Sequence, residues 1–135
     1  MKSKYLLLDT NIVSYIMKNT PQAQLYEKHL SGKILTISFI TVGELWAGAE
    51  WANWGDNKKA QLRATICKFV VIPYNDRIAE HYGAIIAHRK KNGVPISCAD
   101  AWIAACARSY DIPLVTHNAK DFTNIPGLQV ITANP

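Results

Sequence analysis

Residues 5–11 read YLLLDTN, a short apolar run that ends in a carboxylate, a hydroxyl and an amide. An uninterrupted apolar run of this length, bounded by polar residues, is typical of a strand that is buried on both faces of a parallel sheet. Asp9 follows the run directly, and the residues from Asn11 onward have the spacing of a short helix. We therefore expect a strand over 5–8, a helix over 11–17, and Asp9 at the carboxyl end of the strand.

The rest of the chain repeats this alternation of short apolar runs and longer amphipathic segments. Further strands are expected over 34–37, 69–72, 114–116 and 128–131. Further helices are expected from Pro21 to Gly32 and over 41–54, 56–68, 76–91 and 99–110. Alternating strands and helices predict an α/β fold, a parallel sheet of about five strands flanked by helices. In such sheets, ligands bind beyond the carboxyl ends of the strands.

Length and composition favour a single globular domain over 1–135. The chain has 135 residues, of which 49% are hydrophobic and 19% are charged. No apolar run approaches the roughly 20 residues of a membrane span, and the one near the N-terminus is too short for a signal peptide. We therefore expect a cytoplasmic protein without a membrane partner. The net charge of +5 modestly favours a polyanionic partner.

The three cysteines agree with a reducing compartment. Their number is odd and no two form a C-x-x-C pair. Cys67, Cys98 and Cys106 all have apolar neighbours in the sequence, so each is expected to be a small buried thiol.

Four of the ten carboxylates lie beside apolar segments, at strand ends or helix starts. They are Asp9 after the first strand, Glu44 past the second, Asp100 at the start of the most apolar helix, and Asp121 after the fourth strand. Each one taken alone also fits a helix cap or a turn. Together they would repel one another in one crevice, which a divalent cation would relieve. Magnesium prefers oxygen ligands and can activate a water for attack on a phosphodiester.

The segments around these carboxylates resemble the successive motifs of PIN-domain nucleases. The matching segments are Leu8-Asp9-Thr10-Asn11, Ser38-x-x-Thr41-x-x-Glu44-Leu45, Ala99-Asp100-x-x-Ile103-Ala104-Ala105, and Leu114-Val115-Thr116-x-Asn118-x-x-Asp121-Phe122. The segment Ile125-Pro126-Gly127-Leu128 is similar to the one that follows in the VapC-type toxins of bacterial toxin–antitoxin pairs. The resemblance runs from about residue 5 to residue 131.

The resemblance implies both the fold and the activity. It implies a single PIN-like domain and a metal-dependent endoribonuclease that cleaves RNA such as transfer or ribosomal RNA. It also implies that the protein is a toxin, that it forms a homodimer, and that a cognate antitoxin protein neutralises it. The catalytic, metal-binding residues for Mg²⁺ or Mn²⁺ would be Asp9, Glu44, Asp100 and Asp121, supported through hydrogen bonds by Asn11, Thr116 and Asn118.

Three other functions remain open at this point. A housekeeping PIN-domain ribonuclease in RNA maturation or decay would carry the same motifs. An aspartyl-phosphate phosphatase is suggested by Asp9-Thr10-Asn11, although Asn11 replaces the second acid that such enzymes need. A non-catalytic RNA- or protein-binding module is the third alternative, and the retention of all four acids argues against it.

Several basic and aromatic residues have two interpretations each. The runs His88-Arg89-Lys90-Lys91 and Lys58-Lys59 with Arg63 either contact RNA phosphates or form solvated helix faces. Lys120 precedes Asp121 and is therefore expected near the crevice. Trp46, Trp51 and Trp54 either contact a protein partner or pack within the domain.

Overall fold

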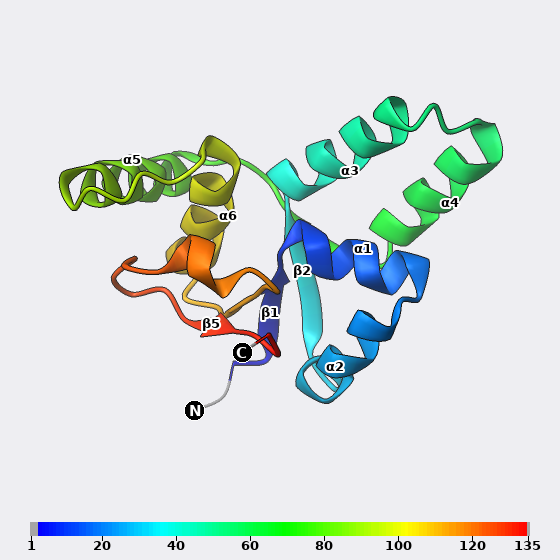
Figure 1. The fold of residues 1–135 in the computed structure, drawn as a ribbon, viewed down its shortest axis with the longest axis horizontal. Coiled ribbons are helices and arrows are strands. Elements are labelled where there is room, and N and C mark those ends of the chain that lie inside the picture. Colours follow the sequence, from blue (N-terminus) through cyan, green and yellow to red (C-terminus); the bar gives the residue numbers. More distant parts are fainter. Residues whose placement is uncertain (1–2, 135) are drawn as a thin grey trace.

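A parallel sheet forms the centre of the protein (Figure 1). The computed structural model describes residues 3–134, in which the strands are β1 (Tyr5–Leu8), β2 (Ile34–Ser38), β3 (Val70–Ile72), β4 (Leu114–Val115) and β5 (Val130–Ile131). They lie in the order β3-β2-β1-β4-β5, and every pair is parallel. The chain builds the sheet outward from β1 to one side and then to the other. The strand order therefore reverses at β1, where a ligand site is expected.

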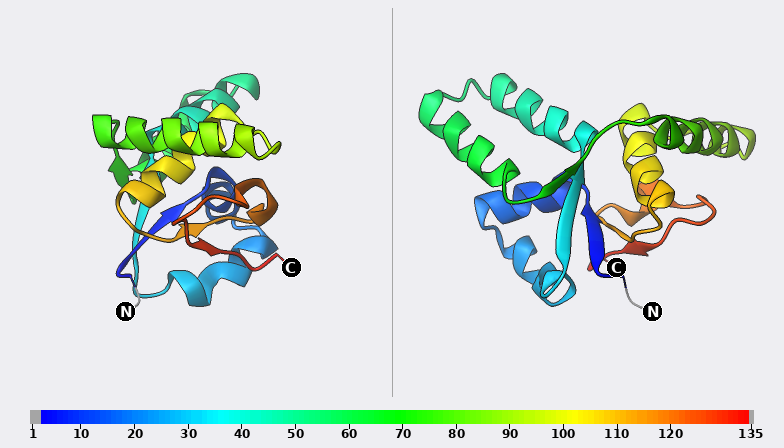
Figure 2. Two further views of the ribbon diagram at one scale, coloured as in Figure 1. Left: turned by 90° about the vertical axis from the view of Figure 1, so that its left-hand side faces the viewer. Right: turned by 180° about the vertical axis from the view of Figure 1, so that it is seen from behind.

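Helices cover the two faces of the sheet (Figures 1 and 2). One face carries α1 (Thr10–Lys18), α2 (Pro21–Leu30), α3 (Phe39–Trp51) and α4 (Asp56–Ile66), and the other carries α5 (Asp76–Lys91) and α6 (Cys98–Ser109). The side chains of β1 alternate between the two faces of the sheet, which explains this arrangement. Leu7 packs into the α5–α6 cluster, whereas Leu6 and Leu8 pack into the cluster formed with α1 to α4. All three leucines are at most 1% exposed, so β1 anchors both halves of the core.

The helix starts bring the polar ends of the strands together. Helix α1 begins directly after β1, and α3 begins directly after β2. Helix α3 contacts both α1 and α6, and α6 also contacts a short 3₁₀ helix, η1 (Ala119–Phe122), which follows β4. Figure 1 shows the α3–α4 pair and the α5–α6 pair diverging from this junction. Three of the four carboxylates singled out from the sequence lie on these elements, and the fourth, Asp9, directly precedes α1.

The expected α/β fold and five parallel strands are confirmed, with differences at element ends. Helix α3 begins at Phe39 rather than Thr41, because the Ser38 hydroxyl caps it by accepting the Thr41 N–H at 3.2 Å. Strand β5 begins at Val130 rather than residue 128, and η1 was not expected.

The cysteine prediction was wrong for two residues of three. Only Cys106 is buried, whereas Cys67 and Cys98 are exposed. Cys67 lies at the end of α4 and Cys98 is the first residue of α6, so both occupy element ends that face solvent. No helix in residues 3–134 combines the length and apolar character needed to span a membrane.

Candidate active site

Asp9 lies at the carboxyl end of the central strand and is held there on both oxygens. Its Oδ1 accepts the Thr10 N–H at 2.8 Å, and its Oδ2 accepts the Thr116 hydroxyl at 2.7 Å. The first of these bonds makes Asp9 the N-cap of α1. The residue is only 7% exposed. The carboxylate is therefore fixed in one orientation at the point where the strand order reverses.

The surroundings of Asp9 disfavour its charged form. Burial is the largest cause, and it raises the pKa of Asp9 from 3.8 to about 6. The hydrogen bonds from Thr116 and Thr10 lower the pKa but do not offset burial. The negative charges of Asp100 and Glu44 raise it further.

Glu44 reaches the same region from the start of α3. Its Oε1 accepts the Thr10 hydroxyl at 2.6 Å, and that hydroxyl also lies 3.0 Å from the Thr41 Oγ1. A threonine hydroxyl has one proton, and the bond to a carboxylate is the stronger use of it. Thr10 therefore donates to Glu44 and accepts from Thr41. This chain of hydroxyls fixes the start of α1 to the start of α3, although Glu44 itself remains exposed.

Asp100 lies in the first turn of α6 and is half-buried. Its N–H donates to the Ser97 hydroxyl at 3.2 Å, which caps the helix. The pKa of Asp100 is raised, with burial as the largest cause; a side-chain hydrogen bond with Ser97 lowers it, and the charges of Asp121 and Glu44 raise it. The positive charge of Arg89 lowers it slightly. Asp121 lies in η1 and is exposed.

Electrostatic interactions link the four carboxylates in a chain. The charges of Glu44 and Asp100 raise the pKa of Asp9. The charges of Glu44 and Asp121 raise the pKa of Asp100. Within residues 3–134, however, no group of three or more His, Cys, Asp or Glu side chains is arranged closely enough to hold a metal ion by itself. Magnesium commonly uses one or two carboxylates, several waters and a substrate phosphate. An open group of carboxylates without a thiolate or imidazole suits such a hard cation.

The residues expected to support the site do so in three different ways. Thr116 is buried and uses its hydroxyl twice, donating to Asp9 and accepting the Asn118 N–H at 3.0 Å. Asn118 therefore contributes through its backbone rather than its side chain. The Asn11 Oδ1 accepts the His117 N–H at 3.4 Å, a long bond that fixes the segment after β4.

Two further residues at the site were missed by the sequence-based reasoning. Thr10 orients Glu44, and its position directly after Asp9 was the available signal. Arg89 was assigned to an exposed basic run, but it is only 3% exposed and contacts the backbone of Asp121. Its spacing of four residues from the buried Ile85 places it on the inner face of α5 and was the signal overlooked.

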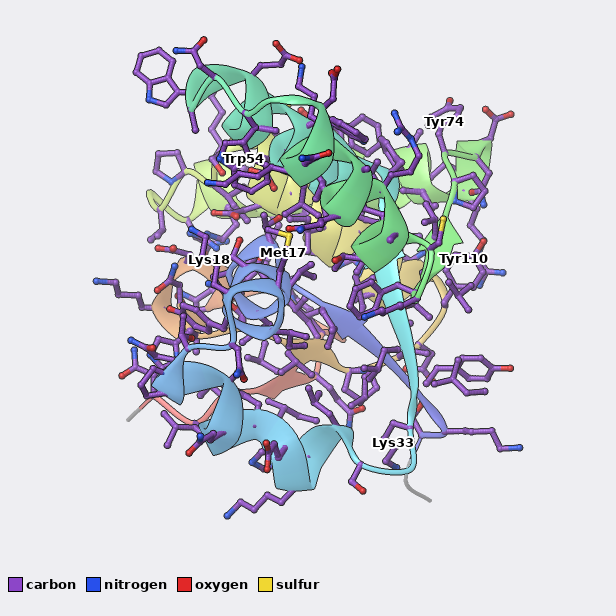
Figure 3. All side chains as sticks on the ribbon, turned by 90° about the vertical axis from the view of Figure 1, so that its right-hand side faces the viewer. Met17, Lys18, Lys33, Trp54, Tyr74 and Tyr110 are labelled. Atoms are coloured by element: carbon purple, nitrogen blue, oxygen red, sulfur yellow. The ribbon has the colours of Figure 1, made fainter. Side chains whose placement is uncertain are left out.

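The three tryptophans near the α3–α4 connection have different surroundings. Trp51 is 91% exposed. Trp46 is half-buried beneath Arg63, whose guanidinium carbon lies 5.2 Å from the ring centre. Trp54 is also half-buried and lines a small hollow with Met17 and Lys18 (Figure 3). Two of the three therefore pack within the domain, while Trp51 has no core role.

Comparison with known proteins gives consistent matches over nearly the whole chain. A family model described as PIN domain matches residues 6–128. Ribonuclease VapC1 of Haemophilus influenzae (strain R2866) is 38% identical over 125 residues, which cover 91% of this chain and 93% of the relative. The tRNA(fMet)-specific endonuclease VapC of Shigella flexneri is 32% identical over 123 residues, with coverage of 91% and 93%.

Solved structures share the fold. VapBC2 from Rickettsia felis, bound to a DNA fragment from its promoter, matches with a TM-score of 0.84 and 25% identity, covering 95% of this chain and 98% of the other. A toxin–antitoxin complex from Klebsiella pneumoniae matches with a TM-score of 0.74 and 29% identity, with coverage of 95% and 97%.

Proposed function

Because this chain belongs to the PIN domain family, we propose that it is an endoribonuclease that acts as the toxin of a toxin–antitoxin pair. The relatives named as ribonucleases and the structural match to a toxin–antitoxin complex support this function. The observation that carries it is the hydrogen-bond network around Asp9, where the strand order reverses. Thr10 joins Asp9 to Glu44, and Thr116 and Asn118 join it to the segment that carries Asp121. The negative charge of Asp100 also acts on Asp9. A structured RNA such as transfer or ribosomal RNA is the proposed substrate, and a cognate antitoxin protein is the proposed inhibitor.

The proposed metal ligands are Asp9, Glu44, Asp100 and Asp121, acting directly or through water on Mg²⁺ or Mn²⁺. When bound, such an ion supplies an activated water and offsets the charge that develops on the phosphodiester. Asp9 provides the most rigid oxygens, because two hydrogen bonds and burial fix it. Thr10 orients Glu44 toward the same region. The exposed Asp121 leaves the cluster open to a large substrate.

The surroundings of the cluster suit a polyanion. The chain carries a net charge of +5, and Lys120 is exposed beside Asp121. We therefore assign Lys120 to contact with an RNA phosphate. The proposed toxin works as a homodimer in the cytoplasm, where transfer RNA and ribosomes are found.

The catalytic assignment is tested by removing single charges from the cluster. Asp9→Asn and Asp100→Asn should each abolish cleavage of bulk transfer RNA in chelator-treated buffer with added Mg²⁺, while circular dichroism shows a folded protein. Asp56→Asn is the matched control, because Asp56 is exposed in the first turn of α4. Wild-type rates in both cluster variants would exclude the assignment.

The toxin assignment is tested in cells. Induced expression should arrest growth, and co-expression of the proposed cognate antitoxin should relieve the arrest. Sequencing of RNA 5′ ends after induction identifies the cleaved RNA. Cleavage in vitro without growth arrest would favour a housekeeping ribonuclease instead.

A further inference from the structure

Arg89 differs from the other basic residues at the end of α5. The neighbouring Lys90 and Lys91 are exposed, whereas Arg89 is only 3% exposed. Burying a charged group costs several kcal/mol unless hydrogen bonds or an opposite charge compensate it. Within residues 3–134, Arg89 has no carboxylate at ion-pair distance. The charges of Arg89 and Asp100 attract each other, but the direct contacts of the guanidinium are hydrogen bonds.

Three backbone carbonyls accept those hydrogen bonds. The Arg89 Nε donates to the Val94 carbonyl at 2.6 Å, which fixes the connection between α5 and α6. Its Nη1 donates to the Asp121 carbonyl at 3.1 Å and to the Thr123 carbonyl at 3.0 Å. One planar guanidinium thus joins the end of α5 to the segment that carries the fourth acid.

The segment around Asp121 needs such external support. Helix η1 has only four residues, and 3₁₀ helices of this length have few internal hydrogen bonds. The Asp121 N–H donates to the Asn118 carbonyl at 3.0 Å, and Phe122 anchors the segment in the core at 3% exposure. The two carbonyls held by Arg89 lie on either side of Phe122. The backbone at Asp121 is therefore fixed from the buried side, while its side chain is exposed.

We propose that Arg89 is a positioning residue, which fixes the Asp121 carboxylate in the acidic cluster by holding the η1 backbone with its buried guanidinium. This inference rests on the proposed function. The property that this role requires is the planar, forked arrangement of the guanidinium N–H groups, rather than the positive charge alone. Lysine keeps the charge but has a single nitrogen, which cannot reach all three carbonyls as the planar guanidinium does.

A purely structural role makes a different prediction. If Arg89 served only to hold the α5–α6 connection through Val94, its loss would lower the melting temperature and leave the metal affinity unchanged. The positioning role requires that the metal affinity falls in protein that is still folded. It also requires that the effect disappears once the Asp121 carboxylate has been removed.

The test measures Mn²⁺ binding by electron paramagnetic resonance of the free ion, well below the melting temperature of each variant. Arg89→Lys should weaken Mn²⁺ binding about tenfold, the lower end of the loss typical for residues that orient metal ligands. Asp121→Asn should weaken it by at least as much. The double variant should bind like Asp121→Asn alone, because both changes remove the same ligand. RNA affinity in the absence of metal should remain within twofold of wild type.

Arg108→Lys is the matched control. Arg108 is also a partly buried arginine that donates to a backbone carbonyl, that of Pro126 at 3.1 Å. We expect it to lower the melting temperature while Mn²⁺ affinity stays within twofold of wild type. Arg89→Met serves as a second variant and should weaken binding at least as much as Arg89→Lys.

The outcomes separate this inference from the proposed function. Wild-type Mn²⁺ affinity in folded Arg89→Lys protein overturns the positioning role, as does an additive loss in the double variant. In either case, Mn²⁺-dependent RNA cleavage by wild type and its absence in Asp9→Asn would leave the proposed function intact. If wild type neither binds Mn²⁺ nor cleaves RNA, the proposed function fails and the inference fails with it.

Discussion

Asp9 combines two roles that are often treated as alternatives. Its carboxylate caps α1 through the Thr10 N–H, and it also lies in the acidic cluster. Capping accounts for one oxygen, whereas the bond from Thr116 and the nearby negative charges are not needed for a cap. Burial of a charge beside other like charges destabilises the metal-free fold. A residue that opposes local stability in this way is typical of a functional site.

The pKa of Asp9 gives a pH-dependent stability that can be measured in metal-free protein. Folding raises its pKa from 3.8 to about 6, so the folded state holds this proton more tightly. The contribution of the protonated Asp9 to the free energy of unfolding is fully present below about pH 4. It is lost as the pH rises through about 6. Relative to wild type, Asp9→Asn should therefore gain stability between pH 4 and pH 8, by on the order of 2 to 3 kcal/mol. Urea unfolding of both proteins in chelator checks this, and a constant difference across the range would contradict it.

Thr116 offers a second test at the level of single groups. Thr116→Val removes the donor to Asp9 and leaves the Asn118 N–H without its acceptor. We expect a loss of about 1 to 3 kcal/mol in the free energy of unfolding. The pKa of Asp9 should also rise, because a hydrogen bond to its charged form is lost. Thermal unfolding and carboxyl-carbon NMR titration measure the two effects.

Thr116→Ser is the control for this prediction, since serine keeps the hydroxyl. It should retain the wild-type pKa of Asp9 and most of the stability. An unchanged Asp9 titration in Thr116→Val would show that the hydroxyl does not act on the carboxylate.

At the scale of elements, the helix starts connect stability to the site. Ser97 caps α6, and the same turn carries Asp100. Ser97→Ala should lower the free energy of unfolding by about 1 kcal/mol, because the hydroxyl satisfies the Asp100 N–H. It should also raise the pKa of Asp100, since the Ser97 side chain lowers that pKa. Chemical denaturation and NMR titration provide the two readouts.

Helix α2 supplies the matched control for that cap. Thr20 precedes α2 at the same position, but its side chain makes no cap hydrogen bond. Among residues 3–134, its Oγ1 is buried without a partner. Thr20→Ala should therefore lower the free energy of unfolding much less than Ser97→Ala does. Equal losses for the two variants would mean that the cap bond of Ser97 is unimportant.

The elements themselves were largely predictable from local patterns. The run over residues 5–8 and the periodic segment over 76–91 correspond to β1 and α5 because period and length alone distinguish a buried strand from a helix. The start of α3 was displaced because Ser38 belongs to the strand and also caps the helix. Helix η1 is too short to leave a periodic signal. Its conformation depends on contacts from Arg89, which lies far away in the sequence.

The whole molecule explains why the cluster could be only partly anticipated. Parallel topology brings strand ends to one edge, so the proximity of Asp9, Glu44 and Asp100 followed from their positions beside apolar segments. The burial of Asp9 and the partial burial of Asp100 did not follow, because they depend on how the two helical layers meet. The role of Arg89 was hidden for the same reason. A basic run appears uniform in sequence, and only the packing of α5 against α6 separates its buried member from the exposed ones.

Metal binding should stabilise the entire fold if the cluster holds the ion. An ion that binds only the folded state at 100 times its dissociation constant adds about 2.7 kcal/mol. Wild type should therefore melt several degrees higher in saturating Mn²⁺ than in chelator. Asp100→Asn should show a much smaller increase at the same Mn²⁺ concentration. Differential scanning calorimetry measures both, and equal increases would place the ion elsewhere.

The central position of β1 has a consequence for synthesis of the protein. Its two neighbours in the sheet are β2, which is translated early, and β4, which is translated late. A nascent chain can therefore display Asp9 and Glu44 while one edge of β1 is still open and Asp121 has not yet been added. An unfinished polypeptide that ends before η1 therefore lacks the fourth proposed metal ligand, and it cannot complete the proposed metal site.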